Sequence, residues 1–223
     1  MITVHHLNNS RSQRVLWLLE ELGLEYQVQH YQRNPVTMLA PSSLRAIHPL
    51  GKSPVLTDND LTLAESGAII EYLLEQYGNG RLEPAAGTPQ RLRYRYWLHY
   101  AEGSAMPLLL LKLIFGRLAR PPMPPLLRPF AALIGSGMQY KYIDPQLRIH
   151  LGFMEAELNK SSWFAGGTFS AADIQMSFPI EGAYSRRVLD SHYPNLLKFL
   201  EAIHARPAYR RAVEKGGAYD LLR

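Results

Sequence analysis

Hydrophobic residues recur along the first third of the chain with two different periods. A β-prone run at residues 2–7 is followed, from Ser12, by apolar positions at helical spacing that end at Gly23. Residues 25–32 then alternate apolar and polar side chains, which is the period of a strand with one wet face. This order predicts a β-α-β unit with parallel strands, because a helix makes the crossover between them.

A second group of short apolar runs follows the proline-containing segment 33–50, which is expected to be mostly loop. SPVLTD and LTLAE flank Asn59 and Asp60, and this spacing predicts a β-hairpin. The next apolar positions mark one face of a helix that ends at Gly78. Residues 1–78 are therefore predicted to form a small α/β domain in the order β-α-β-loop-β-β-α.

Beyond this point the apolar pattern is helical only. Residues 79–89 are rich in glycine and proline and are predicted to be a linker, and residues 90–223 are predicted to form an all-helical domain. Its first long helix is expected to bend at Pro107, and a helical pattern at 131–159 is expected to be interrupted near residues 144–145. The predicted fold class is α/β plus all-α.

The chain has 223 residues and no cysteine. Disulfides, thiolate metal sites and a cysteine nucleophile are thereby excluded, and any thiol chemistry must use a thiol brought by a ligand. No metal site is predicted. The N-terminal stretch lacks the features of a signal peptide, and nowhere are 18 apolar residues unbroken. A soluble, cytoplasmic protein without a membrane partner is expected.

Basic residues outnumber acidic ones, giving a formal net charge of +5. They are densest at residues 90–100, where arginines and tyrosines alternate in a way that could suit stacking on nucleic-acid bases. A helix would instead distribute these side chains around its circumference, and arginine stems commonly cover apolar surface at a helix or subunit contact. No nucleic-acid partner is therefore expected.

Glu65 and Ser66 stand where the predicted hairpin passes into a helix. If Ser66 caps that helix, its hydroxyl and the free N–H groups of the first turn form a carboxylate site, which the helix dipole favours. Glu65 can accept from an ammonium, so the pair matches the zwitterionic head of an amino acid. The alternative is a plain N-cap with an acidic residue that complements the dipole.

Ser53-Pro54 opens the first strand of the hairpin. A proline in this context is a candidate for a cis peptide bond. The backbone of Ser53 could then pair with an extended peptide, and the ammonium of Lys52 is available for a carboxylate. The alternative is a trans proline beside a solvated lysine.

The polar loop LNNSRSQR leaves the first strand and enters the first helix. A thiol held there would have its pKa lowered by the helix dipole and by a donated hydrogen bond. Ser10 and Asn9 are the candidate donors, and Ser12 is the expected helix cap.

The chain resembles the glutathione transferase family in the order of three segments, which are this loop, HPLGKSPVL and LAESGAI. The resemblance covers almost the whole chain, including FAGGTFSAADI and YPNLLKFLEAIHARPAYRRAVEKGG. It implies a thioredoxin-like glutathione-binding domain followed by a helical domain, with glutathione as co-substrate. By this resemblance Glu65 and Ser66 hold the γ-glutamyl head. The backbone of Ser53 before cis-Pro54 pairs with the cysteinyl unit, and Lys52 lies near the glycyl end.

The resemblance also implies a Tyr, Ser or Cys near the first helix that activates the thiol. The early tyrosine is missing and cysteine is absent, so a serine- or asparagine-type site is predicted, with Ser10 preferred and Asn9 as the alternative. His5 and His6 fall in the first strand, where one is expected to be packed and the other exposed. Neither is expected to act in catalysis.

The electrophile is expected to lie opposite the thiol, between the domains. Apolar, methionine-containing walls suit poorly specified hydrophobic substrates. Side chains from residues 97–113 and 138–143 are the candidates for this wall: Tyr100, Ser104, Met106, Leu109 and Tyr140. A core position is the alternative for these side chains and is favoured for Leu109. Glu102 could reach across a dimer interface towards the γ-glutamyl amine.

These expectations combine into a homodimeric glutathione transferase. Ser10, with Asn9, would hydrogen-bond the glutathione sulfur as thiolate, which attacks a small hydrophobic electrophile. Two alternatives stay open. One is a glutathione-dependent disulfide or peroxide reductase that uses two glutathione molecules, and the other is a non-catalytic glutathione-binding interaction protein.

Overall fold

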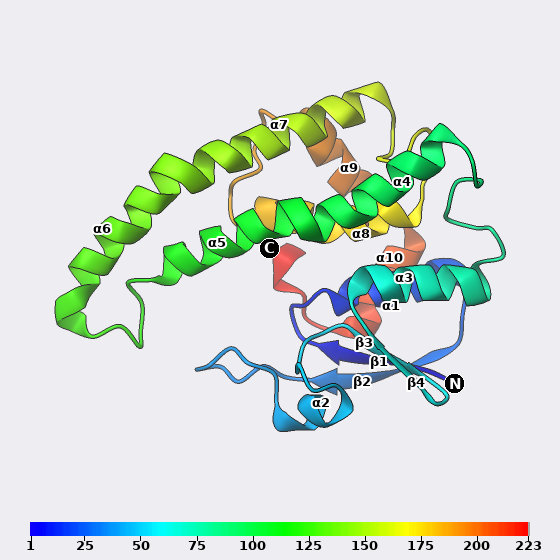
Figure 1. Ribbon diagram of the computed structural model, residues 1–223, viewed down its shortest axis with the longest axis horizontal. Helices are drawn as coiled ribbons and strands as arrows, with labels where there is room; N and C mark the ends of the chain where they lie inside the picture. The colour runs from blue at the N-terminus through cyan, green and yellow to red at the C-terminus, as the bar shows by residue number, and fades with distance from the viewer. Residues whose placement is uncertain (223) are drawn as a thin grey trace.

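A four-stranded sheet forms the first part of the computed structural model, which describes residues 1–222 (Figure 1). Its strands are β1 (Ile2–Leu7), β2 (Tyr26–Tyr31), β3 (Val55–Asp58) and β4 (Leu61–Ala64), in the order β2-β1-β3-β4. β1 is parallel to β2 and antiparallel to β3, and β3 pairs with β4 as a hairpin. Asn59 at the hairpin turn has φ +51°, which asparagine tolerates. The predicted order of elements is confirmed.

Helices cover both faces of this sheet. They are α1 (Ser12–Leu22), α2 (Ser42–Ile47) and α3 (Ser66–Leu73), the last continued by the π-helical turn η1 (Leu74–Gly78). Leu44 of α2 packs with Leu7 on one face, while α1 and α3 pack on the other. His5 and His6 point to opposite faces and both are buried. The expectation that one would be exposed is therefore wrong, because β1 is a central strand with both faces covered.

The rest of the chain is helical, as predicted. Its elements are α4 (Pro89–Tyr100), η2 (Ala101–Ala105), α5 (Met106–Arg117), η3 (Pro125–Leu127), α6 (Arg128–Met138), η4 (Gln139–Ile143), α7 (Asp144–Lys160), α8 (Ala171–Ser185), α9 (Pro194–His204), α10 (Pro207–Gly216) and η5 (Asp220–Leu222). α5 and α6 project together from the body as a two-helix arm (Figure 1). Within the 222 described residues, no helix has the length and apolar content needed to cross a membrane.

Prolines modify the two long helices in the same way. Pro107 and Pro145 each follow a π-helical turn, η2 and η4 respectively. A proline lacks the N–H that an α-helical bond requires, and a single wider turn accommodates that loss without ending the helix. The predicted interruption near residues 144–145 is therefore wrong, because α6 passes through η4 directly into α7.

The end of the chain returns to the first domain. α10 packs along α1, and η5 contacts α8. Figure 1 shows the last turn lying between the base of α5 and the sheet. One apolar core runs through both parts of the chain, and α8 lies buried within it. The division at residues 79–89 stays a prediction.

Candidate active site

The loop between β1 and α1 buries Ser10, which is 4% exposed. Its Oγ lies 2.7 Å from Ser12 Oγ and 3.1 Å from Ser53 Oγ, and it accepts a bond from the Ser12 N–H at 3.3 Å. Ser12 is the first residue of α1, and Arg11 stands at the N-cap position without a side-chain bond. The expectation that Ser12 caps the helix is therefore wrong. The Ser12 hydroxyl contacts His6 Nδ1 instead, at 2.9 Å.

Ser53 joins this loop to the sheet. The Ser53-Pro54 peptide bond is cis, as the sequence suggests. The Ser53 hydroxyl donates to the His5 carbonyl at 3.3 Å and accepts from the Leu7 N–H at 3.4 Å. Lys52 beside it is exposed. The structure thus brings together the two sequence segments expected at the cysteinyl unit, which lie more than 40 residues apart.

Asn9 is held by the end of the chain. Its φ is +51°, and its amide makes two bonds with Asp220. The Asn9 Nδ2 group donates to the Asp220 carboxylate at 2.7 Å, and the Asp220 N–H donates to Asn9 Oδ1 at 2.8 Å. Both ends of the amide are therefore engaged by η5.

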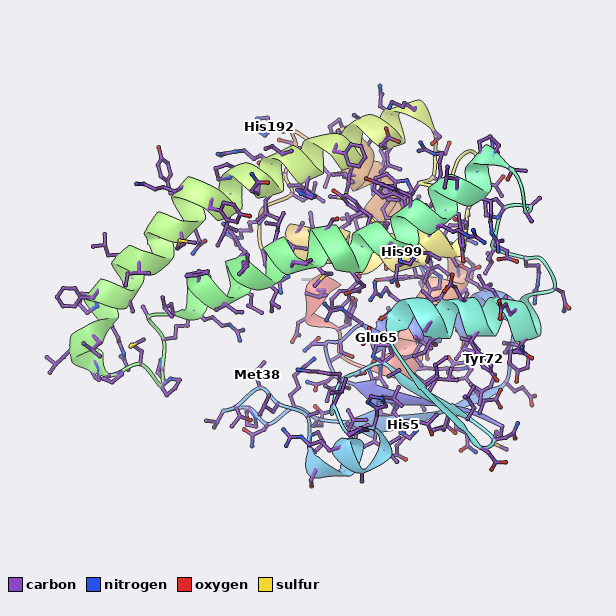
Figure 2. All side chains as sticks on the ribbon, in the orientation of Figure 1. His5, Met38, Glu65, Tyr72, His99 and His192 are labelled. Atoms are coloured by element: carbon purple, nitrogen blue, oxygen red, sulfur yellow. The ribbon has the colours of Figure 1, made fainter. Side chains whose placement is uncertain are left out.

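The start of α3 contains the second predicted pair. Glu65 is exposed and stands at the N-cap position with φ +72°, a conformation that costs energy outside glycine. Figure 2 labels it at the beginning of the helix. Ser66 follows as the first helical residue and is 2% exposed. Its hydroxyl does not cap the helix and accepts from Arg14 Nη2 at 3.0 Å.

Arg14 links this helix start to the helical domain. The side chain is 1% exposed, and its Nη2 group also donates to Glu102 at 2.5 Å. Its Nη1 group donates to the Gln175 carbonyl at 2.7 Å. Arg11 contributes a second guanidinium to Glu102, at 2.9 and 3.0 Å. Burial alone would raise the pKa of Glu102, but the two guanidinium groups outweigh it and hold that pKa below its ordinary value.

Glu102 therefore has its partners within its own chain. Within the chain it lies one hydrogen-bonded residue away from Ser66, through Arg14, and its reach across a dimer interface stays a prediction. Both guanidinium groups also lie over the ring of Phe178, with their central carbons 5.5 and 5.3 Å from its centroid. An acidic group, two basic groups and an aromatic ring thus meet beside α3.

The residues predicted for the electrophile wall lie in different surroundings. Tyr100 is buried and its hydroxyl bonds His150 Nδ1 at 2.6 Å, so it faces α7. Glu102, two residues later, faces α1, and side chains at this spacing point to different sides of a helix. The expectation for Tyr100 is therefore corrected. Met106 and Leu109 are buried as well, Ser104 is half-buried, and Tyr140 is 80% exposed in η4.

Sequence reasoning missed Arg14. It lies three residues after Arg11 and four after Ser10, a spacing that places all three on one side of the first helical turns. The available signal was an arginine directly followed, in the same helix, by the five apolar residues 15–19. Its contacts with Ser66 and Gln175 depend on the tertiary fold, and no local pattern predicts them.

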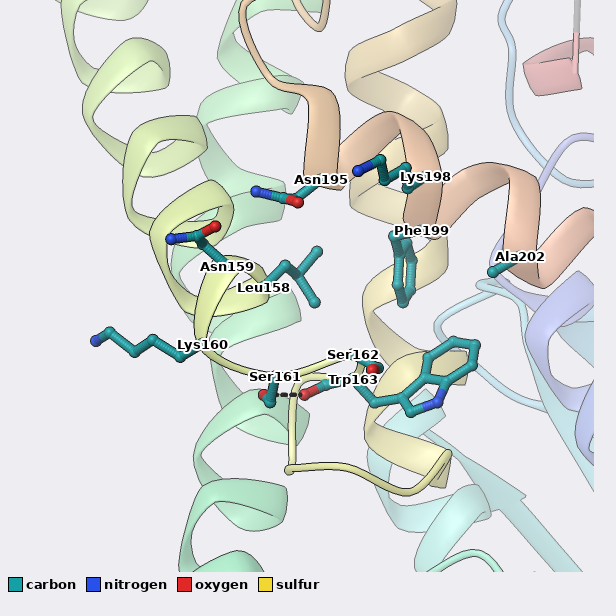
Figure 3. A pocket seen from close by; sticks show the side chains of 10 residues that line it. All are labelled: Leu158, Asn159, Lys160, Ser161, Ser162, Trp163, Asn195, Lys198, Phe199 and Ala202. Carbon is teal, nitrogen blue, oxygen red and sulfur yellow. Dashed lines mark hydrogen bonds between the residues drawn. The ribbon is translucent and has the colours of Figure 1, made fainter.

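A surface pocket of about 500 Å³ lies elsewhere, between the end of α7 and α9 (Figure 3). Its lining includes Lys160, Trp163, Lys198 and Phe199. In the described part of the chain, none of the residues predicted for the site lines this pocket. It has no part in the arrangement described above.

Comparisons with known proteins agree with the geometry. Residues 1–75 match the family model described as glutathione S-transferase, N-terminal domain, and residues 123–207 match the one described as glutathione S-transferase, C-terminal domain. Glutathione S-transferase 3 of Schizosaccharomyces pombe is 34% identical over 215 residues, covering 96% of this chain and 88% of that protein.

Two further comparisons extend this result. A solved glutathione S-transferase from Actinobacillus pleuropneumoniae is 36% identical with a TM-score of 0.80, covering 100% of this chain and 96% of that one. Disulfide-bond oxidoreductase YfcG of Escherichia coli is 28% identical over 228 residues, covering 99% of this chain and 98% of that protein. Both family models and the relatives span most of the sequence. The chain therefore belongs to the glutathione S-transferase family.

Proposed function

We propose that this enzyme transfers the thiolate of glutathione to a small hydrophobic electrophile, with Ser10 as the hydrogen-bond donor to sulfur. One observation carries the proposal. Ser10 Oγ lies 3.1 Å from Ser53 Oγ, and the backbone of Ser53 is the expected partner of the cysteinyl unit. A cysteinyl side chain held by Ser53 would therefore extend towards the Ser10 hydroxyl at the start of α1.

The contacts of Asn9 support Ser10 over Asn9 as the donor. Both ends of the Asn9 amide are engaged with Asp220, so donation to sulfur would require breaking the bond from Asn9 Nδ2. The Ser10 hydroxyl contacts only neutral groups, namely the hydroxyls of Ser12 and Ser53 and the N–H of Ser12, among the described residues. In this proposal, Asn9 holds the loop between β1 and α1 in place through its bonds with Asp220 of η5.

The start of α3 suits the γ-glutamyl head. Its free N–H groups and the positive end of its dipole favour the carboxylate, and Arg14 adds a full positive charge next to Ser66. Glu65 is exposed and Glu102 is 31% exposed, so both carboxylates are available to the ammonium. Lys52, exposed beside Ser53, is assigned to the glycyl carboxylate.

The hydrogen bond from Ser10 would supply much of the thiol activation. A bond to a charged group contributes about 1.5–3 kcal/mol, which corresponds to about one or two pKa units. A thiol whose ordinary pKa is about 8.5 would then ionise near neutrality. Positioning of the thiolate against the electrophile contributes the remainder.

The test is the thiol pKa of bound glutathione, followed by ultraviolet absorbance of the thiolate. We expect Ser10→Ala to raise it by about one or two units and to lower the conjugation rate at neutral pH correspondingly. Asn9→Ala is the matched control and should leave the thiol pKa in place. An unchanged profile in Ser10→Ala, with the shift appearing in Asn9→Ala, would reassign the donor.

A second candidate is reduction of disulfides with two glutathione molecules. The similarity to Disulfide-bond oxidoreductase YfcG favours it, and the absence of cysteine requires both thiols to come from glutathione. Turnover of a mixed glutathione disulfide should be compared with turnover of an aromatic halide. A much higher kcat/KM on the disulfide would favour reduction over conjugation.

The homodimer is a further proposal. Exposed apolar side chains on α4 and α7 support it, namely Leu92, Tyr96, Ile149 and Phe153. A monomer of this size rarely leaves such side chains together on a surface without a partner. Light scattering on the purified protein distinguishes a monomer from a dimer by its molar mass.

A further inference from the structure

The end of the two-helix arm exposes large apolar side chains to solvent. This end, residues 114–134, is called the arm tip below, and it projects away from the body of the molecule (Figure 1). Leu126 and Leu133 are 88% and 73% exposed. The exposed apolar side chains of the tip are Ile114, Leu126, Leu127, Phe130, Leu133 and Ile134. A patch of this kind on a folded protein marks an interaction surface.

Packing within the arm does not account for these side chains. The buried residues of α6 are Ala131 and Gly135, and a Cβ added to Gly135 would lie 2.6 Å from the Phe115 carbonyl oxygen of α5. The two helices therefore meet through small residues. A helix of a water-soluble protein normally turns its large apolar side chains to the core. Helix α6 turns Phe130 and Leu133 outward instead, so these two side chains do not hold the arm together.

The charge of the arm is of one sign. The chain has 24 basic and 19 acidic residues, and residues 106–142 contain five of the basic ones and none of the acidic ones. The rest of the chain is therefore balanced at 19 of each, and the whole net charge of +5 lies in this segment. Lys112 pairs with Asp144 at 2.6 Å. Among the described residues, four cations of the segment have no carboxylate partner, namely Arg117, Arg120, Arg128 and Lys141.

We propose that the arm tip docks on an anionic lipid membrane, with its leucines and Phe130 among the acyl chains and its arginines at the phosphate groups. Exposed Leu and Phe beside unpaired Arg are the pattern of a segment that lies in a membrane interface. A second copy fits less well, because two tips would bring only positive charges together. A nucleic acid would use the arginines but would leave the aliphatic side chains in water.

This proposal departs from the sequence-based expectation of no membrane partner. That expectation rested on the lack of a long apolar run, which bears on spanning helices only. Helix α6 has 11 residues, whereas a span needs about 20, so the tip would lie in the interface and not cross it. The proposal goes beyond the proposed function and does not depend on it.

Vesicle sedimentation with the full chain is the first test. We expect binding to vesicles of phosphatidylcholine mixed with phosphatidylglycerol, little binding to phosphatidylcholine alone, and release as salt screens the charges. Leu126→Ser combined with Leu133→Ser should weaken binding by about tenfold or more. Arg117→Gln combined with Arg120→Gln should weaken it by about tenfold. Leu61→Ser is the control, since it changes an exposed leucine of the β3-β4 hairpin, across the molecule from the arm (Figure 1), and should bind as wild type.

Phe130→Trp gives a second readout that does not depend on weakening the tip. A tryptophan that enters the bilayer should be quenched by lipids with brominated acyl chains, measured as the difference from the native protein. Glutathione conjugation in solution should be unchanged in all these variants, because none of their positions belongs to the site of the proposed function.

Several outcomes overturn the inference. One is a wild-type protein that stays in solution with anionic vesicles at low salt. Another is vesicle binding that the two leucine changes leave intact, with no quenching at position 130, which would mean adsorption by charge alone. A molar mass in light scattering that falls in the leucine variant would make the tip a contact between copies. Binding to an RNA oligonucleotide in place of vesicles would assign the arginines to nucleic acid.

Discussion

The starts of α1 and α3 are both helix N-termini with a buried serine, yet their surroundings differ. Ser10, in the loop before α1, contacts neutral groups, the hydroxyls of Ser12 and Ser53. Ser66, at the start of α3, contacts the guanidinium of Arg14, which is paired with Glu102. Both helix starts offer a positive dipole end, and only the second adds full charges.

This difference matches the two ends of the ligand. A γ-glutamyl head has fixed opposite charges, so rigid ion pairs can recognise it before any chemistry occurs. The thiol of free glutathione is mostly neutral and becomes charged in the site, and a hydroxyl can turn its proton to sulfur when the charge appears. In the proposed function, the same helix feature serves recognition at α3 and activation at α1.

The largest effect is expected from Arg14→Met. This change leaves Glu102 without its buried partner and removes the donors to Ser66 and to the Gln175 carbonyl. Loss of one member of a buried pair costs about 3–5 kcal/mol. We expect the free energy of unfolding, measured in urea, to fall by about that amount.

Arg11→Met is the matched control for the charged cluster. Arg11 pairs with the same Glu102 carboxylate but is 35% exposed. An exposed pair contributes about 1 kcal/mol or less, so this variant should stay close to wild type. Equal losses in the two variants would show that burial of Arg14 does not determine its contribution.

A smaller effect is expected from His6 and depends on pH. The folded pKa is about 4, below the ordinary value of 6.5. Between these pH values the unfolded chain binds a proton that the folded protein does not, so stability is full above pH 6.5 and is lost as pH falls. The free energy of unfolding should decrease by about 2–3 kcal/mol over this range.

His6→Phe should lack this part of the pH dependence. The groups facing His6 are Ser12, His30 and the backbone of Gly216, and the other titrating groups remain in both proteins. The difference between the two urea-unfolding series therefore isolates His6. Parallel pH profiles of the unfolding free energy in the two proteins would contradict a buried imidazole that stays neutral in the folded state.

Local pattern predicted much of this arrangement. The alternating and helical periods gave the order of strands and helices, and Ser53-Pro54 and Ser10 were found from short motifs. What failed depends on contacts between distant segments. The burial of both His5 and His6 requires helices on two faces of β1, and the inward position of Tyr100 depends on α7.

The charged cluster shows the same limit. Arg14 contacts Ser66 and Glu102, which lie 52 and 88 residues away in the sequence. The contacts of Asn9 with Asp220 span 211 residues. Periodicity describes which face of an element is apolar and carries no information about which element will cover it. Residues with chemical roles at a junction of three helices are therefore the hardest to predict.

The smallest effects test the comparison most directly, because they separate affinity from activation. Ser66→Ala removes a hydroxyl at the charged helix start and should weaken glutathione binding about tenfold, the effect of one hydrogen bond to a charged group. The thiol pKa of glutathione bound to this variant should stay in place.

Ser10→Ala should show the reverse, with affinity retained at pH well below the thiol pKa, where sulfur is neutral. The double variant should combine both changes additively, since Ser10 bonds Ser12 and Ser53 whereas Ser66 bonds Arg14. Calorimetry and thiolate absorbance on the four proteins measure both quantities. A thiol pKa that moves in Ser66→Ala as far as in Ser10→Ala would mean that the two helix starts act as one site.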